Sequence, residues 1–205
     1  MGFQLQRDQP TVQGEIEKSL TKFTGEKIRI RGASRTDSGA HAKGQVVDFL
    51  TQSANKVEQY PPGMNFYLQQ DIRVQAAYRM IPEFHSRKSA HSRIYQYRIF
   101  NRQWPSPLGR HSSYWVRAPL DVDRMAAAAK HLVGSHDFRA LAPGFEADRS
   151  AIRTVYRWEV RREDDTVVIE CEANGFLRHQ IRRTNALLIE IGKGRWSADL
   201  VNQVL

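Results

Sequence analysis

Residues 153–172 read RTVYRWEVRREDDTVVIECE, and this stretch decides the fold class. Two strand patterns, Arg153–Arg162 and Thr166–Glu172, are separated by the acidic turn Glu163-Asp164-Asp165, which is typical of a β-hairpin. Hairpins set between helical segments, rather than single strands that alternate with helices, indicate an α+β domain. We therefore expect a largely antiparallel sheet with helices on one face.

Helical and strand patterns extend from the hairpin toward both ends of the chain. Apolar residues at helical spacing predict helices over Thr11–Phe23, Asp121–Val133 and Phe176–Gly192. Thr11 and Asp121 suit the cap position, because a side-chain oxygen there accepts a hydrogen bond from the first helical turn. Further strands are expected over Lys27–Arg31, Gln45–Leu50, Ile72–Ile81 and Ser92–Phe100. The order of helix, strands, helix, strands and helix fits the α+β class.

The composition indicates a basic, folded protein. The 205 residues carry a formal net charge of +9 and are 40% hydrophobic, which fits one large domain or two small ones that share a core. A basic chain suits a nucleic-acid partner, although an acidic protein or a membrane surface would suit it too. No stretch approaches the ~20 consecutive apolar residues that span a bilayer, and residues 1–10 contain no apolar signal core. We therefore expect a soluble, unexported protein that makes no membrane contact.

Cysteine and histidine do not indicate a redox or metal site. Cys171 is the only cysteine, which excludes an internal disulfide and fits a reducing compartment. Its apolar neighbours in 167–169 make Cys171 a packed strand residue rather than a nucleophile. The seven histidines lack the spacing typical of metal ligands, so we expect no metal.

The strand predicted over Ser92–Phe100 combines aromatic and basic side chains. Its period of two places Tyr95 and Tyr97 side by side on one face. Residues 84–120 contain seven Lys and Arg and no acid. Cations that follow phosphates, with rings that stack on bases, make a groove for single-stranded or looped nucleic acid. The alternative is an edge strand whose charges protect it against aggregation.

One carboxylate stands alone among cations on a loop that contains glycine. Asp37 is the only acid between Lys27 and Val47, a stretch with five Lys and Arg. A carboxylate in such surroundings stays ionised, so in a reaction it would act as a nucleophile or base. Alternatively, Asp37 is a turn residue that binds nearby backbone amides. Ser34, Asp37 and His41 do not indicate a serine hydrolase, because a triad crowded into one short loop cannot easily reach the required geometry.

Two arginines open the last predicted helix. Arg178 and Arg182 are four residues apart, so a helix over Phe176–Gly192 would place them on one face. One of them could then anchor a phosphate while the other pairs with a carboxylate. The alternatives are a solvated basic face or salt bridges to Glu172 and Glu190.

Four motifs follow one another along the chain. They are R-T-D-x-G-x-H-A at Arg35–Ala42, F-H-x-R at Phe84–Arg87 followed by Y-x-Y at Tyr95–Tyr97, G-S-H-D-F at Gly134–Phe138, and F-x-R-H-x-[IV]-R at Phe176–Arg182. In this order they resemble the motifs of the TruA-type tRNA pseudouridine synthases. The resemblance implies two α+β halves, 1–103 with the aspartate loop and aromatic strand and 104–205 with the helix arginine, that meet at a basic central cleft.

The resemblance also implies the reaction, which is the isomerisation of uridine to pseudouridine in the anticodon stem-loop of tRNA. It needs no cofactor or metal, and the enzyme would be a cytoplasmic homodimer. Asp37 would be the catalytic residue, whether it attacks the sugar C1′, attacks the base or deprotonates the sugar. Arg182 would keep Asp37 ionised through a charge-assisted pair. Tyr95 would stack on the target base and is the candidate acceptor of the C5 proton, with Tyr97 in support.

The remaining motif residues would contact RNA. Arg35 would hold the flipped nucleotide or its phosphate, and His41, Arg87 and Arg178 would make further contacts. By the same resemblance, a further strand would precede Gly2, and a further helix and strand would follow residue 205. The alternatives are therefore a truncated, non-catalytic RNA-binding homologue or a basic protein-interaction module.

Overall fold

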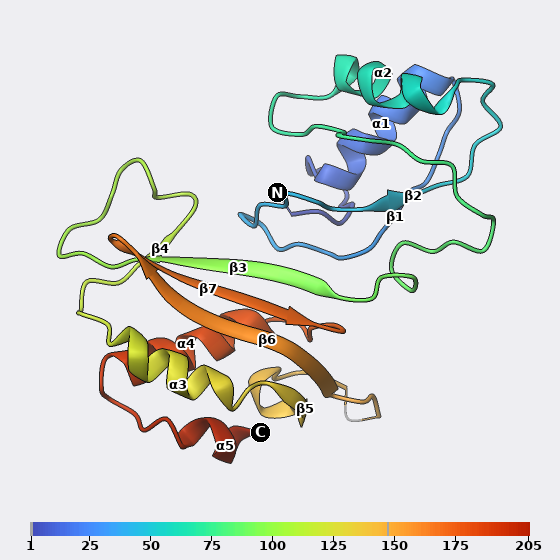
Figure 1. Cartoon of the computed structure of the whole chain (residues 1–205). Helices are drawn as coiled ribbons and strands as arrows, with labels where there is room; N and C mark the ends of the chain where they lie inside the picture. Colours follow the sequence, from blue (N-terminus) through green and yellow to red (C-terminus); the bar gives the residue numbers. More distant parts are fainter. Residues whose placement is uncertain (1, 147) are drawn as a thin grey trace. The chain divides into compact units, whose positions relative to one another are not determined.

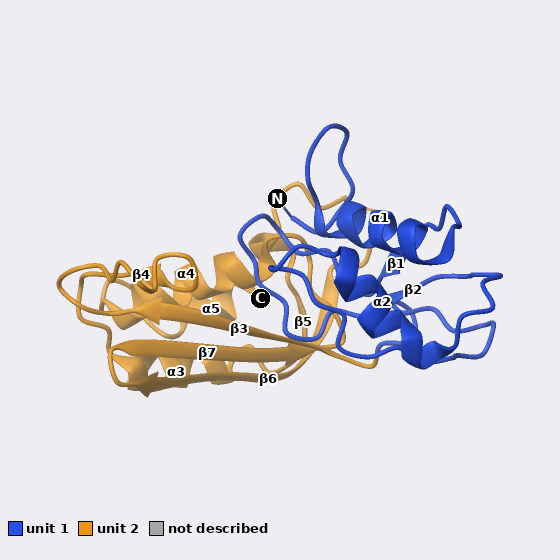
Figure 2. Cartoon of the chain, turned by 90° about the horizontal axis from the view of Figure 1, so that it is seen from above, with its two compact units in different colours: residues 1–90 blue, residues 91–205 orange. Residues whose placement is uncertain are grey.

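The computed structural model describes residues 2–146 and 148–205, and the chain divides into two compact units. Unit 1 is residues 1–90 and unit 2 is residues 91–205 (Figures 1 and 2). This boundary precedes the one expected at residue 103. The aromatic strand, expected in the N-terminal half, belongs to unit 2 because it pairs along its whole length with a strand of that unit.

Within residues 2–90, unit 1 has two helices, a 3₁₀ turn and a short antiparallel strand pair. Its elements are α1 (Val12–Thr24), β1 (Arg31–Gly32), β2 (Val47–Asp48), η1 (Val57–Gln59) and α2 (Tyr60–Tyr67). As predicted, Thr11 caps α1, and its hydroxyl accepts a hydrogen bond from the N–H of Gly14 at 3.2 Å. The core is made of eight buried side chains: Phe3, Ile16, Leu20, Ile28, Ile30, Tyr60, Met64 and Leu68.

The strands of unit 1 are shorter than the sequence predicts. Of the segment Lys27–Arg31 only Arg31 lies in β1, and of Gln45–Leu50 only Val47 and Asp48 form β2. The strand predicted over Ile72–Ile81 does not form, so this prediction is wrong. The backbone N–H and C=O of Val74 instead bond to the side-chain amide of Asn65, both at 2.8 Å. Asn65 therefore occupies the groups that a neighbouring strand would need.

Unit 2 is built on a five-stranded sheet with the order β4-β3-β7-β6-β5. The strands are β3 (Arg93–Phe100), β4 (Tyr114–Trp115), β5 (Gly134–Asp137), β6 (Ile152–Glu163) and β7 (Thr166–Ala173). All neighbours are antiparallel except β3 and β4, which run parallel. The hairpin of β6 and β7 confirms the prediction. Its turn holds Asp164 at a φ of 49°, a left-handed conformation that aspartate tolerates.

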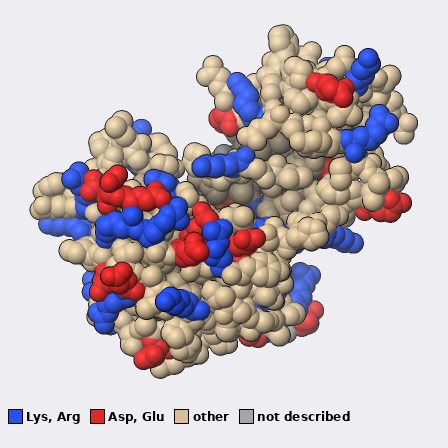
Figure 3. Space-filling view, in the orientation of Figure 1, with Lys and Arg blue, Asp and Glu red and all other residues tan. Residues whose placement is uncertain are grey.

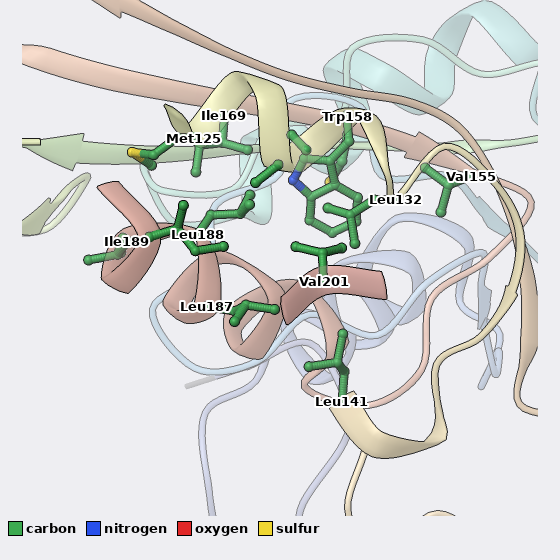
Figure 4. Packing of buried hydrophobic residues seen from close by; sticks show 14 of the residues in the cluster. Met125, Leu132, Leu141, Val155, Trp158, Ile169, Leu187, Leu188, Ile189 and Val201 are labelled. Carbon is green, nitrogen blue, oxygen red and sulfur yellow. The ribbon is translucent and has the colours of Figure 1, made fainter. Parts of the chain in front are cut away.

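Helices cover one face of this sheet, as predicted (Figure 1). They are α3 (Val122–Lys130), the 3₁₀ turn η2 (Arg139–Leu141), α4 (Gln180–Gly192) and α5 (Leu200–Val204). The main core lies between the sheet and the helices, and Figure 4 shows Trp158 of β6 pointing toward Leu132 and Val201 there. Among the helices described, none combines the length and the apolar character that a membrane crossing requires.

Two helix starts were predicted in unit 2; the structure confirms the first and moves the second to a later residue. Asp121 caps α3, as predicted, by accepting a hydrogen bond from the N–H of Arg124 at 3.0 Å. Helix α4 begins at Gln180 rather than Phe176. The amide oxygen of Gln180 accepts the N–H of Leu177 at 2.7 Å, and the intervening His179 has a left-handed φ of 64°.

This later start removes one arginine from the helix. Arg178 precedes α4, whereas Arg182 lies in its first turn. The prediction that the two arginines share one helix face is therefore wrong.

Candidate active site

Asp37 lies on the loop between β1 and β2, as predicted. Its backbone carbonyl accepts a hydrogen bond from the N–H of Ala40 at 3.1 Å, which closes a turn. Gly39 within this turn has a φ of 80°, where a residue with a side chain would be strained. The side chains of Arg35, Asp37 and His41 in the loop's motif are all exposed. The loop thus presents its carboxylate to solvent from a defined turn.

Gly2 and Phe3 pack directly against the aspartate loop, and we call this pair of residues the Gly2-Phe3 seat. The N–H of Phe3 donates to the carbonyl of Thr36 at 3.1 Å. A Cβ atom on Gly2 would lie 2.8 Å from that same carbonyl oxygen and 3.1 Å from the nitrogen of Ser38. Phe3 is itself buried, and a Cβ on Gly32 would lie only 2.6 Å from its ring. The backbone on both sides of Asp37 is therefore positioned by close packing against this Gly2-Phe3 seat.

Asp48 of β2 connects the strand pair to the turn that carries Arg87. Its carboxylate accepts hydrogen bonds from the N–H of Ser86 at 2.9 Å and from Nε of Arg31 at 2.7 Å. The hydroxyl of Ser86 donates to the carbonyl of Arg31 at 3.2 Å. Burial acts to raise the pKa of Asp48, but the hydrogen bonds from Ser86 and the Arg31 guanidinium outweigh it and hold this pKa below its usual value. The exposed Arg87 thus extends from an anchored turn.

Sequence reasoning missed this network. Arg31 and Asp48 face each other across the β1–β2 pair, in strand patterns that were both predicted. Pairing opposite charges across those two patterns would have indicated the contact.

Tyr95 and Tyr97 lie on the same face of β3, as predicted. The ring of Tyr95 meets the ring of Phe176 edge-on, with centroids 5.3 Å apart and planes at 88°. Phe176 in turn contacts the buried Trp158 at a centroid distance of 6.2 Å. An aromatic chain therefore ties Tyr95 to the core of unit 2.

Cys171 is buried in β7, directly across from Tyr95 of β3 and Trp158 of β6 in the strand register. Burial raises the pKa of its thiol to about 12. At neutral pH the thiolate needed for nucleophilic chemistry is therefore essentially absent. The prediction of a packed strand residue is confirmed.

Tyr97 has a second tyrosine and an arginine in its surroundings. The rings of Tyr97 and Tyr114 are 6.4 Å apart and inclined at 48°. Burial raises the pKa of Tyr97, Tyr114 adds to the rise, and the charge of Arg182 opposes it. The hydroxyl therefore stays protonated at neutral pH and can donate a hydrogen bond. Arg182 is exposed and donates to Nδ1 of His179 in the turn before α4.

The eight predicted site residues divide equally between the units. Unit 1 holds Arg35, Asp37, His41 and Arg87, and unit 2 holds Tyr95, Tyr97, Arg178 and Arg182. Within unit 2 the structure brings Tyr97 within electrostatic reach of Arg182, and it adds Tyr114, which sequence reasoning missed. Arg178 is exposed on the turn before α4.

On the face of unit 2 that Figure 3 shows, Lys and Arg lie among Asp and Glu. Arg157 pairs with Glu170 at 2.7 Å and with Glu172 at 3.8 Å. Glu190 at the end of α4 pairs with Lys193 and Arg195. The two acids considered as partners for the helix arginines therefore neutralise other cations.

Comparison with known proteins identifies the family. A family model described as tRNA pseudouridine synthase matches residues 2–87 and 128–205. The chain belongs to the tRNA pseudouridine synthase family. Members of this family are isomerases that act on tRNA, and this chain is therefore an isomerase. Its α+β fold agrees with the membership. The first matched segment contains Asp37 and Arg87, and the second contains Arg178 and Arg182.

Individual members of the tRNA pseudouridine synthase family align with most of the chain. The tRNA pseudouridine synthase A of Acetivibrio thermocellus is 37% identical over 204 residues, which cover 100% of this chain and 84% of the relative. That of a Thermoanaerobacter species is 38% identical with the same coverage. The tRNA pseudouridine synthase A 2 of Bacillus cereus is 38% identical over 198 residues, which cover 95% of this chain and 80% of the relative.

Proposed function

We propose that this chain isomerises uridine to pseudouridine in the anticodon stem-loop of tRNA, with Asp37 as the catalytic carboxylate. The observation that carries the proposal is the exposed Asp37 on a loop held by the Gly2-Phe3 seat, within a segment that the family model matches. An exposed carboxylate can reach a nucleotide that has been extruded from the RNA.

The reaction balances without an oxidant or a cofactor. The bond from C1′ to N1 breaks, a bond from C1′ to C5 forms, C5 loses a proton and N1 gains one. The freed uracil must turn over inside the site, so the enzyme has to retain the base and exclude water. Asp37 would start this sequence by attacking C1′, by attacking the base or by deprotonating the sugar.

In this proposal the residues of unit 2 act on the base and on Asp37. Arg182 pairs with Asp37 and orients it, as a charge-assisted hydrogen bond does. Tyr95 stacks on the target base, and the edge-on contact with Phe176 supports this role by fixing its ring. Tyr97 is protonated and close enough to Arg182 to sense its charge, which suits a supporting donor. The proposal requires the site residues of both units to meet at one basic cleft.

The remaining residues would bind the RNA. Arg35, His41, Arg87 and Arg178 have exposed side chains that can contact phosphates or the flipped nucleotide. By resemblance to the family, we extend the proposal to a cytoplasmic homodimer that holds one tRNA across both subunits.

An Asp37→Asn variant tests the proposal. Wild-type protein incubated with a tRNA transcript should form pseudouridine in the anticodon stem-loop without added metal. Asp37→Asn should form none, while its affinity for tRNA stays close to that of the wild type. Asp8→Asn is the matched control, because Asp8 is an exposed acid of the same unit, and it should leave turnover unchanged.

Each other outcome has a definite meaning. Normal turnover by Asp37→Asn would remove Asp37 from the reaction. Binding by the wild type that weakens with salt, but without product, would identify a non-catalytic RNA-binding homologue. Pseudouridine that maps outside the anticodon stem-loop would keep the activity and correct the substrate.

A further inference from the structure

Two adjoining cavities open at the end of β3, in unit 2. The first has a volume of about 550 Å³, and its lining includes Arg102, Arg117 and Arg162. The second, of about 450 Å³, shares Arg102 with the first and includes Trp104. We call these four residues the Arg–Trp site. The segment 88–127, which supplies three of them, lies between the two stretches that the family model matches.

The side chain of Asn101 ties together several segments that line the Arg–Trp site. Its amide nitrogen donates to the carbonyls of Val116 at 2.9 Å and Ala118 at 2.7 Å. Its amide oxygen accepts from the N–H of Leu120 at 3.3 Å and from Nη2 of Arg162 at 3.1 Å. The cavity is therefore shaped by hydrogen bonds before any ligand arrives.

Cations in the site outnumber the acids that neutralise them. Arg102 pairs with Asp165 at 3.0 Å. For residues 2–146 and 148–205, no ion pair of Arg117 or Arg162 with an acid is found within 4.0 Å. Arg162 uses Nη2 for its bonds to Asn101 and to the carbonyl of Leu120, which leaves other guanidinium donors available. Two positive charges therefore lie at the cavity without a carboxylate, which suits an anion such as a phosphate.

Trp104 provides a ring beside these charges. Its side chain is 70% exposed, although the guanidinium of Arg117 lies 5.9 Å from the ring centroid. The loop under it is fixed, because the indole N–H of Trp115 donates to the carbonyl of Arg102 at 3.0 Å. An exposed indole with an arginine over one face is a stacking platform for a base.

We propose that the Arg–Trp site binds RNA outside the target nucleotide, with a backbone phosphate at Arg117 and Arg162 and an unpaired base stacked on Trp104. Asn101 is six residues along the chain from Tyr95, so the site lies roughly 20 Å from the tyrosine that would hold the target base. The exposed ring of Trp104 favours RNA as the ligand, because a base can stack on it. An acidic peptide would need only the arginines. The identity of the RNA as tRNA rests on the proposed function.

The test compares two variants with two matched controls. Trp104→Ala removes the platform, and Arg117→Gln removes one charge. The controls are Trp196→Ala and Lys130→Gln, which change an exposed tryptophan and an exposed lysine elsewhere in unit 2. Affinity is measured for a full tRNA transcript over a range of salt concentrations, and turnover is measured at saturating RNA.

Trp104→Ala should weaken tRNA binding by about tenfold, as the loss of one stacked base does. Arg117→Gln should reduce the slope of log affinity against log salt by about one. Trp104→Ala and Arg117→Gln should also raise KM for tRNA. The two controls should bind tRNA like the wild type and keep its kcat.

The outcomes separate this inference from the proposed function. If the wild type forms pseudouridine but both variants bind tRNA normally, the inference fails and the function stands. If both variants bind weakly but the wild type forms no pseudouridine, the function fails and the RNA site stands. If the variants keep tRNA affinity but lose binding to a polyglutamate peptide, the site belongs to an acidic protein partner and the inference is overturned.

Discussion

The ring of Tyr95 stands perpendicular to the ring of Phe176, with 5.3 Å between their centroids. Tyr95 belongs to β3, whereas Phe176 belongs to the turn that leads into α4. The contact therefore couples the strand that carries both tyrosines to the segment that carries Arg178 and Arg182. A substitution of Phe176 should therefore alter the position of the Tyr95 ring, even though Phe176 need not touch the substrate.

Phe176→Leu tests this coupling. The substitution keeps an apolar side chain but removes the edge-on pair, at a cost of about 1 kcal/mol in the free energy of unfolding. We expect kcat to fall while KM for tRNA changes little, because affinity comes mainly from phosphate contacts. Phe66→Leu is the control, since Phe66 makes a similar edge-on pair with Tyr67 on the exposed surface of unit 1. An equal loss of kcat in both variants would show that Phe176 has no specific link to Tyr95.

Gly2→Ala should disturb the aspartate loop without unfolding the protein. The new Cβ would lie 2.8 Å from the carbonyl oxygen of Thr36, so the loop backbone must shift. We expect kcat to fall by about 10- to 100-fold, the effect of a small misplacement of a catalytic group. Gly44→Ala is the matched control, because a Cβ atom on Gly44 would meet no other atom within 4 Å. Equal kcat values for the two variants would refute the role of the Gly2-Phe3 seat.

Asp48 should stabilise unit 1 in a pH-dependent way. Its pKa in the folded protein lies below its unfolded value, so the ionised carboxylate contributes stability above pH ~4 and loses it as pH falls through the folded pKa. Asp48→Asn should lower the free energy of unfolding by about 2 kcal/mol at pH 7, the value of charged hydrogen bonds. Urea titrations at several pH values check this, with Asp8→Asn as the exposed control. A difference between Asp48→Asn and wild type that stays constant from pH 7 down to pH 3 would contradict the prediction.

The thiol of Cys171 should resist alkylation in the native protein. With a pKa of about 12, roughly one thiol in ten thousand is ionised at pH 8. We expect no iodoacetamide labelling of the folded protein over hours and rapid labelling in denaturant, read by mass spectrometry. Fast labelling in the native state would show that the packing around Cys171 opens readily.

Patterns carried by whole segments could be predicted from the sequence. The β6–β7 hairpin, the caps at Thr11 and Asp121, and the shared face of the β3 tyrosines all follow from spacing over several residues. The strand patterns also placed Asp37 on a loop between two strands, and the helical pattern placed Arg182 on a helix, although that helix begins four residues later than predicted.

Features decided by single side chains could not be predicted. The amide of Asn65 takes the backbone groups of Val74, and the amide of Gln180 closes the turn that delays α4. Tyr114 lies in a two-residue strand, too short to leave a periodic pattern in the sequence. In these places single contacts or very short elements decide the structure, and neither leaves a periodic pattern in the sequence.

The side chain of Asn101 meets four partners at once, two at each end of its amide. An amide is the uncharged side chain of this length that both donates twice and accepts twice. Aspartate would set oxygen against the carbonyls of Val116 and Ala118, and leucine would leave backbone groups unbonded. Position 101 thus accepts essentially only asparagine. Although Asn101 need not touch the RNA, its side chain determines how the arginines and Trp104 of the Arg–Trp site are positioned.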